Sequence, residues 1–189
     1  MFYIPVILGS IRRNRESAKI AKFAVTWLGK IEDVRTELLD LKDLDLPMME
    51  ERLRFRDDVP ANVAELSAKI TCADSIVIVT PEYNSGYPGV LKNALDYLKP
   101  EYKRKPFGII TVSVENGGAM CLAALRQVIL HLGGVPIPAE LAVHHVRESF
   151  DPEGSPLLPG FQKRAKDYFD ELVWFTKALA THRAKAAQS

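Results

Sequence analysis

The sequence predicts an α/β protein with three layers, in which a parallel sheet lies between two layers of helices. Two observations predict this fold class. Continuous apolar runs alternate with segments whose apolar residues recur at helical spacing, and the alternation occurs five times. Strand–helix alternation of this kind builds parallel sheets with right-handed crossovers. In addition, the loops after the first and third apolar runs have unusual compositions, and such loops are where these sheets bind ligands.

The five expected strands read as apolar on both faces, which is typical of a parallel sheet covered by helices on each side. The clearest is the run Ser75-Ile-Val-Ile-Val-Thr80, whereas the last run is interrupted by prolines. The expected strands are residues 2–8, 34–41, 75–80, 106–114 and 135–143. Five strands favour the order 2-1-3-4-5 of flavodoxin-like folds, whose switch point lies between strands 1 and 3.

The expected helices show apolar residues three and four positions apart. Prolines and glycines mark several of their ends, such as Pro60 before one helix and Gly133-Gly134 after another. The expected helices are residues 17–28, 61–72, 89–98, 119–132 and 161–180. Residues 45–56 and 146–160 are expected to form loops, and the tail from residue 181 is expected to be frayed.

Composition limits the function classes. A length of 189 residues suits one domain, 1–189, and the formal net charge of +1 gives no reason to expect nucleic acid or a membrane as a partner. No apolar run approaches the roughly 18 residues that cross a bilayer. The first residues have no basic segment before their apolar run, so they indicate a strand rather than a signal peptide. Cys72 and Cys121 are in no metal-ligand spacing, which favours a reduced, cytoplasmic protein.

The first loop, Gly9–Ser17, joins a buried strand to a helix start and carries the letters GSIRRNRES. Free amides and the positive end of the helix dipole attract phosphate there. Ser10 and Ser17 add hydroxyl donors, and Arg12 and Arg15 can add charge-assisted bonds. The alternative is a solvated basic turn in which Ser17 serves as the helix N-cap. Because neither GxxxxGK[ST] nor GxGxxG is present, a monophosphate fits this loop better than a pyrophosphate.

The loop after the third expected strand is TPEYNSGYPG, from Thr80 to Gly89. It offers backbone amides, aromatic side chains and the amide of Asn84 at the same edge of the sheet as the first loop. Such a set suits a flat ring system that forms hydrogen bonds. Together the two loops predict a site for a phosphorylated ring compound at the switch point.

Three motifs resemble those of the NADPH-dependent FMN reductase family: GSIRRNRESAKIA, PEYNSGYPGVLKNALDYL and SVENGGA. The resemblance implies a flavodoxin-like fold and FMN as the cofactor. The implied phosphate-binding residues are Ser10, Arg12 and Ser17, with Arg15 at a position that is often basic. The implied ring-binding residues are Pro81, Glu82, Tyr83 and Asn84 along the flavin, and Ser113, Gly117 and Gly118 at its other edge. Glu115-Asn116 departs from the smaller residues of many relatives.

The implied activity is an FMN-dependent NAD(P)H oxidoreductase, in which hydride transfer through flavin N5 carries electrons to a small-molecule acceptor. Acceptors of this class are quinones, azo compounds, free flavin and metal oxyanions. Since NADPH, or NADH, and flavin supply the chemistry themselves, no catalytic side chain is expected. The resemblance also implies a homodimer or a dimer of dimers, through the helices 89–98 and 119–132.

Two other function classes remain open from the sequence. A flavodoxin-type electron carrier shares the fold but is usually strongly acidic, whereas this chain has a net charge of +1 and three arginines near the phosphate loop. A flavin-free binding or regulatory protein would retain the fold without the cofactor.

Overall fold

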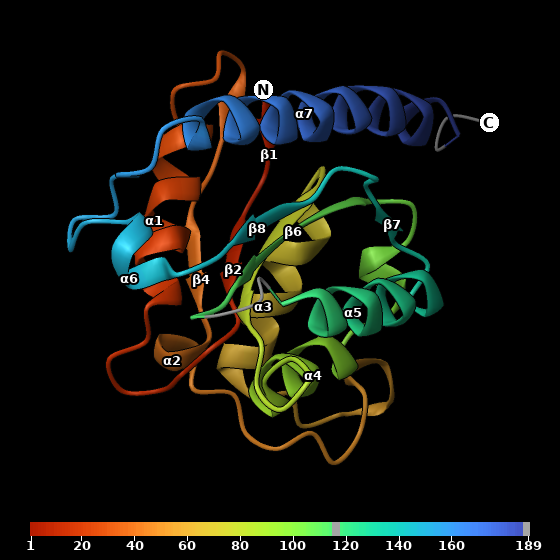
Figure 1. The fold of residues 1–189 in the computed structure, drawn as a ribbon. Coiled ribbons are helices and arrows are strands. Elements are labelled where there is room, and N and C mark those ends of the chain that lie inside the picture. Colours follow the sequence, from red (N-terminus) through yellow and green to blue (C-terminus); the bar gives the residue numbers. More distant parts are fainter. Residues whose placement is uncertain (115–117, 187–189) are drawn as a thin grey trace.

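A twisted parallel sheet with helices on both sides forms the body of this computed structural model, which describes residues 1–114 and 118–186 (Figure 1). The main sheet has the order β4-β2-β5-β6-β7, and β8 also pairs with β6. These strands are β2 (Val6–Leu8), β4 (Leu38–Asp40), β5 (Ile76–Pro81), β6 (Pro106–Val112), β7 (Val135–Pro136) and β8 (Leu141–Val143). A separate two-stranded sheet pairs β1 (Phe2–Tyr3) with β3 (Val34–Arg35), and every pair in both sheets is parallel.

The expectation of a single five-stranded sheet is correct only in part: each expected strand has the neighbours that the order 2-1-3-4-5 requires, but β1 and β3 form a sheet of their own and the first two expected strands are divided. In total, three of the expected strands are each divided into two short ones. The first divides at Ile4-Pro5, where proline lacks the N–H that a ladder needs. The register nevertheless continues across this break, since Phe2 pairs with Val34 and Val6 with Leu38. The fifth divides between Pro136 and Leu141, where a second proline, Pro138, lies.

The long helices lie close to where the sequence places them. They are α1 (Ser17–Leu28), α3 (Ala61–Cys72), α4 (Gly89–Asp96), α5 (Ala119–His131) and α7 (Phe161–Ala186). The shorter helical segments were not expected: α2 (Leu41–Leu44), η1 (Leu53–Phe55), η2 (Pro100–Tyr102) and α6 (Val146–Ser149). The expected fraying from residue 181 is wrong as far as Ala186, because the Arg183 side chain donates to the carbonyl oxygens of Arg104 and Asp74 at 2.8 and 2.9 Å. No helix among the described residues has the length and apolar character needed to cross a membrane.

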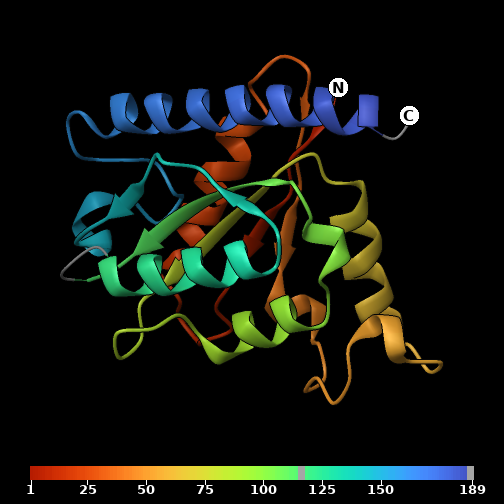
Figure 2. The same cartoon turned by 90° about the vertical axis from the view of Figure 1, so that its right-hand side faces the viewer.

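Alternation along β5 separates the core into two layers. Ile76 and Ile78 pack with the apolar residues of α3, α4 and α5, whereas Val77 and Val79 pack with those of α1 and α7. Figure 2 shows α7 along one side of the sheet and α4 and α5 along the other. Because both faces are buried, the carboxyl edge of the sheet is where its loops can form a site.

Candidate functional site

The loops that follow β2 and β5 contact each other directly. The buried hydroxyl of Ser10 shares a hydrogen bond of 2.8 Å with the phenol oxygen of Tyr83. The Arg12 guanidinium carbon lies 5.3 Å from the centre of the Tyr83 ring, within the range of a cation–π contact. The first loop, Gly9–Ser17, and the turn that contains Tyr83 therefore form two walls of one site.

A hollow of about 160 Å³ lies between these loops. Seven of the residues named from the sequence line it: Arg12, Arg15, Ser17, Pro81, Glu82, Tyr83 and Ser113. Six further lining residues were not anticipated: Asn14, Glu16, Val112, Val114, Val146 and Arg147. Ser10 lies behind Tyr83, Asn84 is exposed at the end of a turn, and Gly118 lies buried at the start of α5. Gly117 is outside the described residues.

Ser17 is the first residue of α1, at the point where the helix dipole is positive. The N-cap is Glu16, without a side-chain capping bond, so Ser17 does not serve as the N-cap. The Ser17 hydroxyl oxygen is fully buried and has no hydrogen-bond partner among the described residues. A buried hydroxyl without a partner is costly, and Ser17 is among the residues that line the hollow. The start of α1 is a place where an anion is favoured.

Arg15 is already engaged within the protein. Its guanidinium forms a salt bridge with Asp40 at the end of β4 and also donates to the carbonyl oxygen of Ser10. Both side chains of the pair are largely buried, at 13% and 11% exposure. The other oxygen of Asp40 accepts from the amide of Lys42 at 2.9 Å, which caps α2. Arg15 therefore links the first loop to the neighbouring strand, and its charge is partly neutralised.

The Tyr83 turn is a tight hairpin. Tyr83 and Gly86 exchange two backbone hydrogen bonds, of 2.7 and 3.1 Å, and the residues between them have positive φ angles: 51° at Asn84 and 63° at Ser85. Positive φ at both central positions is the geometry of a type I′ turn, which asparagine tolerates better than most residues. The side chain of Asn84 therefore projects from the tip of a turn that closes tightly on itself.

Glu82 links the base of this turn to the start of α5. Its carboxylate accepts from the amide of Cys121 at 2.9 Å, in the first turn of α5. A carboxylate at this position satisfies one of the free amides of the helix start. The same residue donates its own amide to the Val112 carbonyl oxygen at 3.4 Å. Burial raises the pKa of the Cys121 thiol to about 11, so this sulfur remains protonated near neutral pH and supplies no thiolate nucleophile.

The third loop begins at Ser113, whose amide donates to the Val143 carbonyl oxygen at 3.0 Å. At its far end, Gly118 has a φ of 82°, and a Cβ there would lie 2.9 Å from the Cβ of Thr111. Both the backbone conformation and the close approach require glycine. Within residues 1–114 and 118–186 no group of three or more His, Cys, Asp or Glu side chains could hold a metal ion.

Comparison with known proteins identifies the family. Residues 3–148 match the profile of the NADPH-dependent FMN reductases. An FMN-dependent NADPH-azoreductase of Staphylococcus aureus is 31% identical over 175 residues, which are 90% of this chain and 93% of that protein. This chain belongs to the NADPH-dependent FMN reductase family.

Solved structures agree with this membership. The flavoenzyme NAD(P)H:acceptor oxidoreductase FerB of Paracoccus denitrificans has a TM-score of 0.77 and 28% identity, with 96% of this chain and 99% of that one covered. An oxidoreductase of Corynebacterium diphtheriae, with a TM-score of 0.75 and 20% identity over 94% of this chain and 98% of that one, supports the fold. As a member of this family, the chain is an FMN-dependent NAD(P)H oxidoreductase with a flavodoxin-like fold, and FMN and NADPH are its cofactor and electron donor.

In this FMN reductase, Arg147 is a charged lining residue that the sequence analysis missed. It lies in α6, directly after β8, and its guanidinium is 3.2 Å from the Glu16 carboxylate at the mouth of the hollow. The pKa of Glu16 is lowered, first by its hydrogen bond with Lys19 and also by Arg147. Its position in the sequence could have predicted a place in the site, because Arg147 follows the last strand at the same carboxyl edge of the sheet as the first two loops.

Proposed function

We propose that the hollow between the first loop and the Tyr83 turn receives the phosphate end of FMN. The observation that carries this proposal is the buried Ser17 hydroxyl, which lacks a partner at the positive end of α1. Arg12 supplies a guanidinium beside it, and Arg15 supports the loop through Asp40. At about 160 Å³ the hollow is smaller than the roughly 300 Å³ of most ligand sites, so it accounts for part of the cofactor.

The ring-binding residues are proposed on the same basis. Pro81, Glu82 and Tyr83 form one wall, and Ser113 and Gly118 belong to the loop beside it. Asn84 and Gly117 remain proposed ring contacts from the family resemblance. Glu82 and the type I′ turn hold this wall rigid, which favours binding of a flat ring because little order has to be gained on binding.

When bound, FMN would accept a hydride from the reduced nicotinamide and pass the electrons to an oxidant. The role of this chain is to hold the phosphate, to fix the Tyr83 turn, and to leave the ring accessible on one face. We propose that the oxidant is a small planar or oxyanion molecule: a quinone, an azo compound, free flavin or a metal oxyanion.

The absorbance spectrum of the purified protein tests the flavin site. FMN-loaded protein should be yellow, NADPH should bleach it without oxygen, and a quinone or an azo dye should restore the colour. Stopped-flow reduction by NADPH and by NADH then ranks the donors. Protein that stays colourless after incubation with FMN would contradict the proposed site, and negligible NADPH oxidation without a separate reductase would support an electron carrier instead.

We further propose that this reductase is a homodimer, or a dimer of dimers. Met120 and Leu130 on α5 are each 61% exposed. A second copy against α5 would cover them. Sedimentation should show a species of at least twice the chain mass, and a monomer at all concentrations would contradict the assembly.

Two broader expectations are also proposals. We infer that residues 1–189 form one FMN-binding domain, because α7 packs in the same core layer as β2 and β5. Circular dichroism and flavin release should therefore report the same single unfolding transition.

We infer a cytoplasmic location because Cys72 and Cys121 are both free thiols, as is usual in a reducing compartment. Fractionation of cells should place the protein there.

A further inference from the structure

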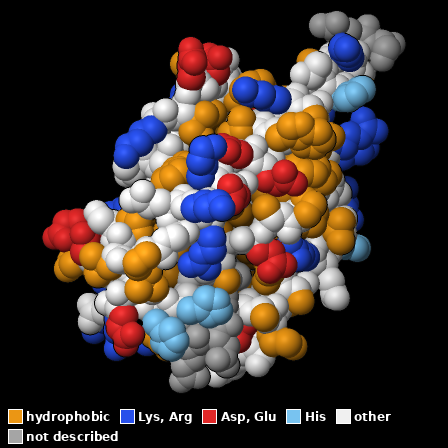
Figure 3. Space-filling model, turned by 45° about the horizontal axis from the view of Figure 1, so that its top comes forward, with side chains coloured by type: hydrophobic (Ala, Val, Ile, Leu, Met, Phe, Trp, Pro, Cys, Tyr) orange, Lys and Arg blue, Asp and Glu red, His pale blue; other side chains and the backbone are white. Residues whose placement is uncertain are grey.

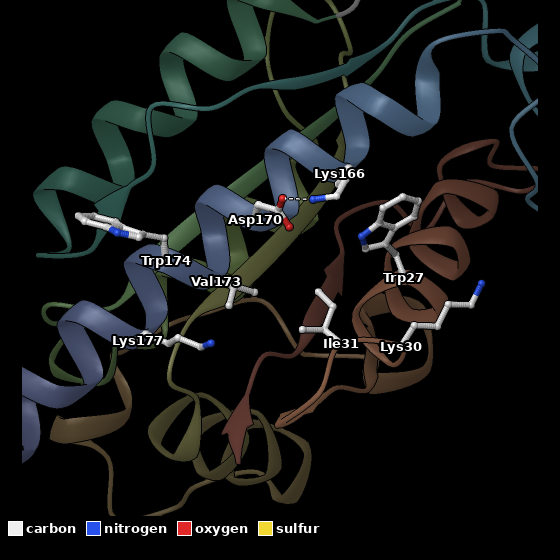
Figure 4. Close-up of a pocket in the computed structure, with 8 residues that line it drawn as sticks. All are labelled: Trp27, Lys30, Ile31, Lys166, Asp170, Val173, Trp174 and Lys177. Carbon is white, nitrogen blue, oxygen red and sulfur yellow. Dashed lines mark hydrogen bonds and ion pairs between the residues drawn. The ribbon is translucent and has the colours of Figure 1, made fainter.

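A larger hollow lies away from the FMN loops, between the end of α1 and the middle of α7 (Figure 4). Its volume is about 640 Å³, within the range of small-molecule sites. The helix α1 begins at Ser17 in the FMN hollow and ends at Leu28, a rise of about 18 Å, so the two hollows lie at opposite ends of this helix. This groove is therefore separate from the proposed FMN site.

The floor of the groove is apolar and partly aromatic. Ile31 and Val173 face each other across the gap between the helices, and Trp27 forms one side (Figure 4). The Trp27 ring stacks on Phe169, with ring centres 5.8 Å apart and planes inclined by 18°. Trp174 also lines the groove and is 63% exposed. A tryptophan held in one orientation by stacking offers a prepared surface for another ring.

The rim of the groove is positively charged. Lysines provide three ammonium groups, and Asp170 provides one carboxylate. Lys166 is paired with Asp170, as Figure 4 shows. Lys30 and Lys177 are exposed and form no salt bridge with any described residue. The groove thus combines an aromatic floor with two uncompensated positive charges.

We propose that this groove binds an aromatic anion, a small ring compound that carries a carboxylate or sulfonate. Its ring would lie on the floor formed by Trp27, Ile31 and Val173, and its anionic group would interact with Lys30 and Lys177. Charge complementarity favours this occupant over a neutral ring compound.

A second copy of the chain fits the groove less well. The exposed face of α7 next to Trp174 is charged at Asp170 and Lys177, whereas the centres of protein interfaces are depleted of charge. Figure 3 shows this mixture, with hydrophobic side chains separated by charged ones on the side of the molecule where α7 lies.

The chain offers a direct readout, because it contains two tryptophans and both line the groove. FMN-loaded protein is titrated with 1-anilinonaphthalene-8-sulfonate while energy transfer from tryptophan to the probe is recorded. The uncharged N-phenyl-1-naphthylamine, which has the same rings without the sulfonate, is the matched probe. We expect saturable binding of one sulfonate probe per chain, weaker binding of the neutral probe, and weaker sulfonate binding at high salt.

Variants locate the binding. Replacing both free lysines, Lys30→Gln with Lys177→Gln, should weaken sulfonate binding about fivefold or more, since exposed charges each contribute modestly. Lys163→Gln on the same helix, outside the groove, should leave it unchanged. Equal affinity for both probes, or no effect of the double variant, would overturn the proposal. So would a dimer that dissociates in Trp174→Ala, since a second copy would then occupy the groove.

Discussion

The hydroxyl oxygen of Ser10 and the phenol oxygen of Tyr83 lie 2.8 Å apart, although 73 positions separate the residues in the sequence. Ser10 follows the central strand β2 and Tyr83 follows its neighbour β5, so the bond joins the carboxyl ends of two adjacent parallel strands. It sets the separation of the two walls between which the FMN phosphate is proposed to bind.

Tyr83→Phe removes this bond and keeps the ring beneath Arg12. A neutral hydrogen bond of this kind contributes about 1 kcal/mol, so we expect FMN affinity to fall about fivefold with little change in the spectrum of the bound flavin. Fluorescence titration of the apoprotein with FMN measures this change. Tyr87→Phe is the control, because Tyr87 lines a different hollow beside α4 and α5. Equal losses in the two variants would show that the Ser10–Tyr83 bond has no special role.

Ser17→Ala should separate binding from stability. The Ser17 hydroxyl has no partner in the protein, so its removal should leave the unfolding free energy of the apoprotein unchanged or raise it by about 1 kcal/mol. Loss of a bond to a phosphate should nevertheless weaken FMN binding about tenfold or more. Urea unfolding and FMN titration give the two quantities, with Ser67→Ala on α3 as a control for serine removal from a helix. A destabilised apoprotein with unchanged FMN affinity would show that Ser17 is structural.

Arg15 and Asp40 should behave as a coupled pair. Asp40→Asn leaves the guanidinium without its carboxylate in a largely buried place, so we expect a loss of about 2 kcal/mol in unfolding free energy and weaker FMN binding through a displaced first loop. Arg15→Gln should produce a similar loss, and the double variant should cost less than the sum of the two. Additive effects on FMN affinity would instead indicate that Arg15 contacts the phosphate independently of Asp40.

The sequence predicted the three layers and the edge of the sheet where the site lies. Both predictions depend on the spacing of apolar residues and on the position of loops, which can be read from short stretches of sequence. It could not show that Arg15 is paired with Asp40, since that contact depends on how β4 lies beside β2. The continuation of α7 beyond residue 180 could not be predicted for the same reason. Arg183 donates hydrogen bonds to the carbonyl oxygens of Asp74 and Arg104, which are distant in the sequence. In contrast, the division of the first strand could have been predicted, because Pro5 marks it.

Two glycines near the site should respond oppositely to alanine. At Gly118 a φ of 82° and a Cβ 2.9 Å from that of Thr111 make alanine unfavourable, by about 2 kcal/mol of unfolding free energy. At Gly89, the first residue of α4, an added Cβ has no atom within 4 Å, so alanine should be neutral or stabilise by about 0.5 kcal/mol. Thermal and urea unfolding compare the two. Equal effects would mean that the bend before α5 does not depend on glycine.

Lys105 should make stability depend on pH in the alkaline range. The residue is 7% exposed, and its ammonium donates to the carbonyl oxygens of Ile70 and Thr71 at the end of α3. Burial, with a smaller effect of Arg183, lowers the pKa of Lys105 from 10.5 to about 8. Between these values the unfolded chain binds more protons than the folded one, so the unfolding free energy should rise with pH, by about 3 kcal/mol in total.

Burial raises the pKa of Tyr3, Tyr102 and Tyr168, which makes the unfolding free energy fall at alkaline pH, so a comparison with a variant is needed to isolate the lysine. Urea unfolding of the normal protein and of Lys105→Met is measured from pH 7 to pH 10, and the difference between them should shift in favour of the normal protein as pH rises through 8. Lys103→Met, at an exposed neighbouring position, should follow the normal protein throughout. A difference between the normal protein and Lys105→Met that stays constant with pH would show that Lys105 keeps its ordinary pKa, with its ammonium stabilised by the two carbonyl oxygens as fully as by water.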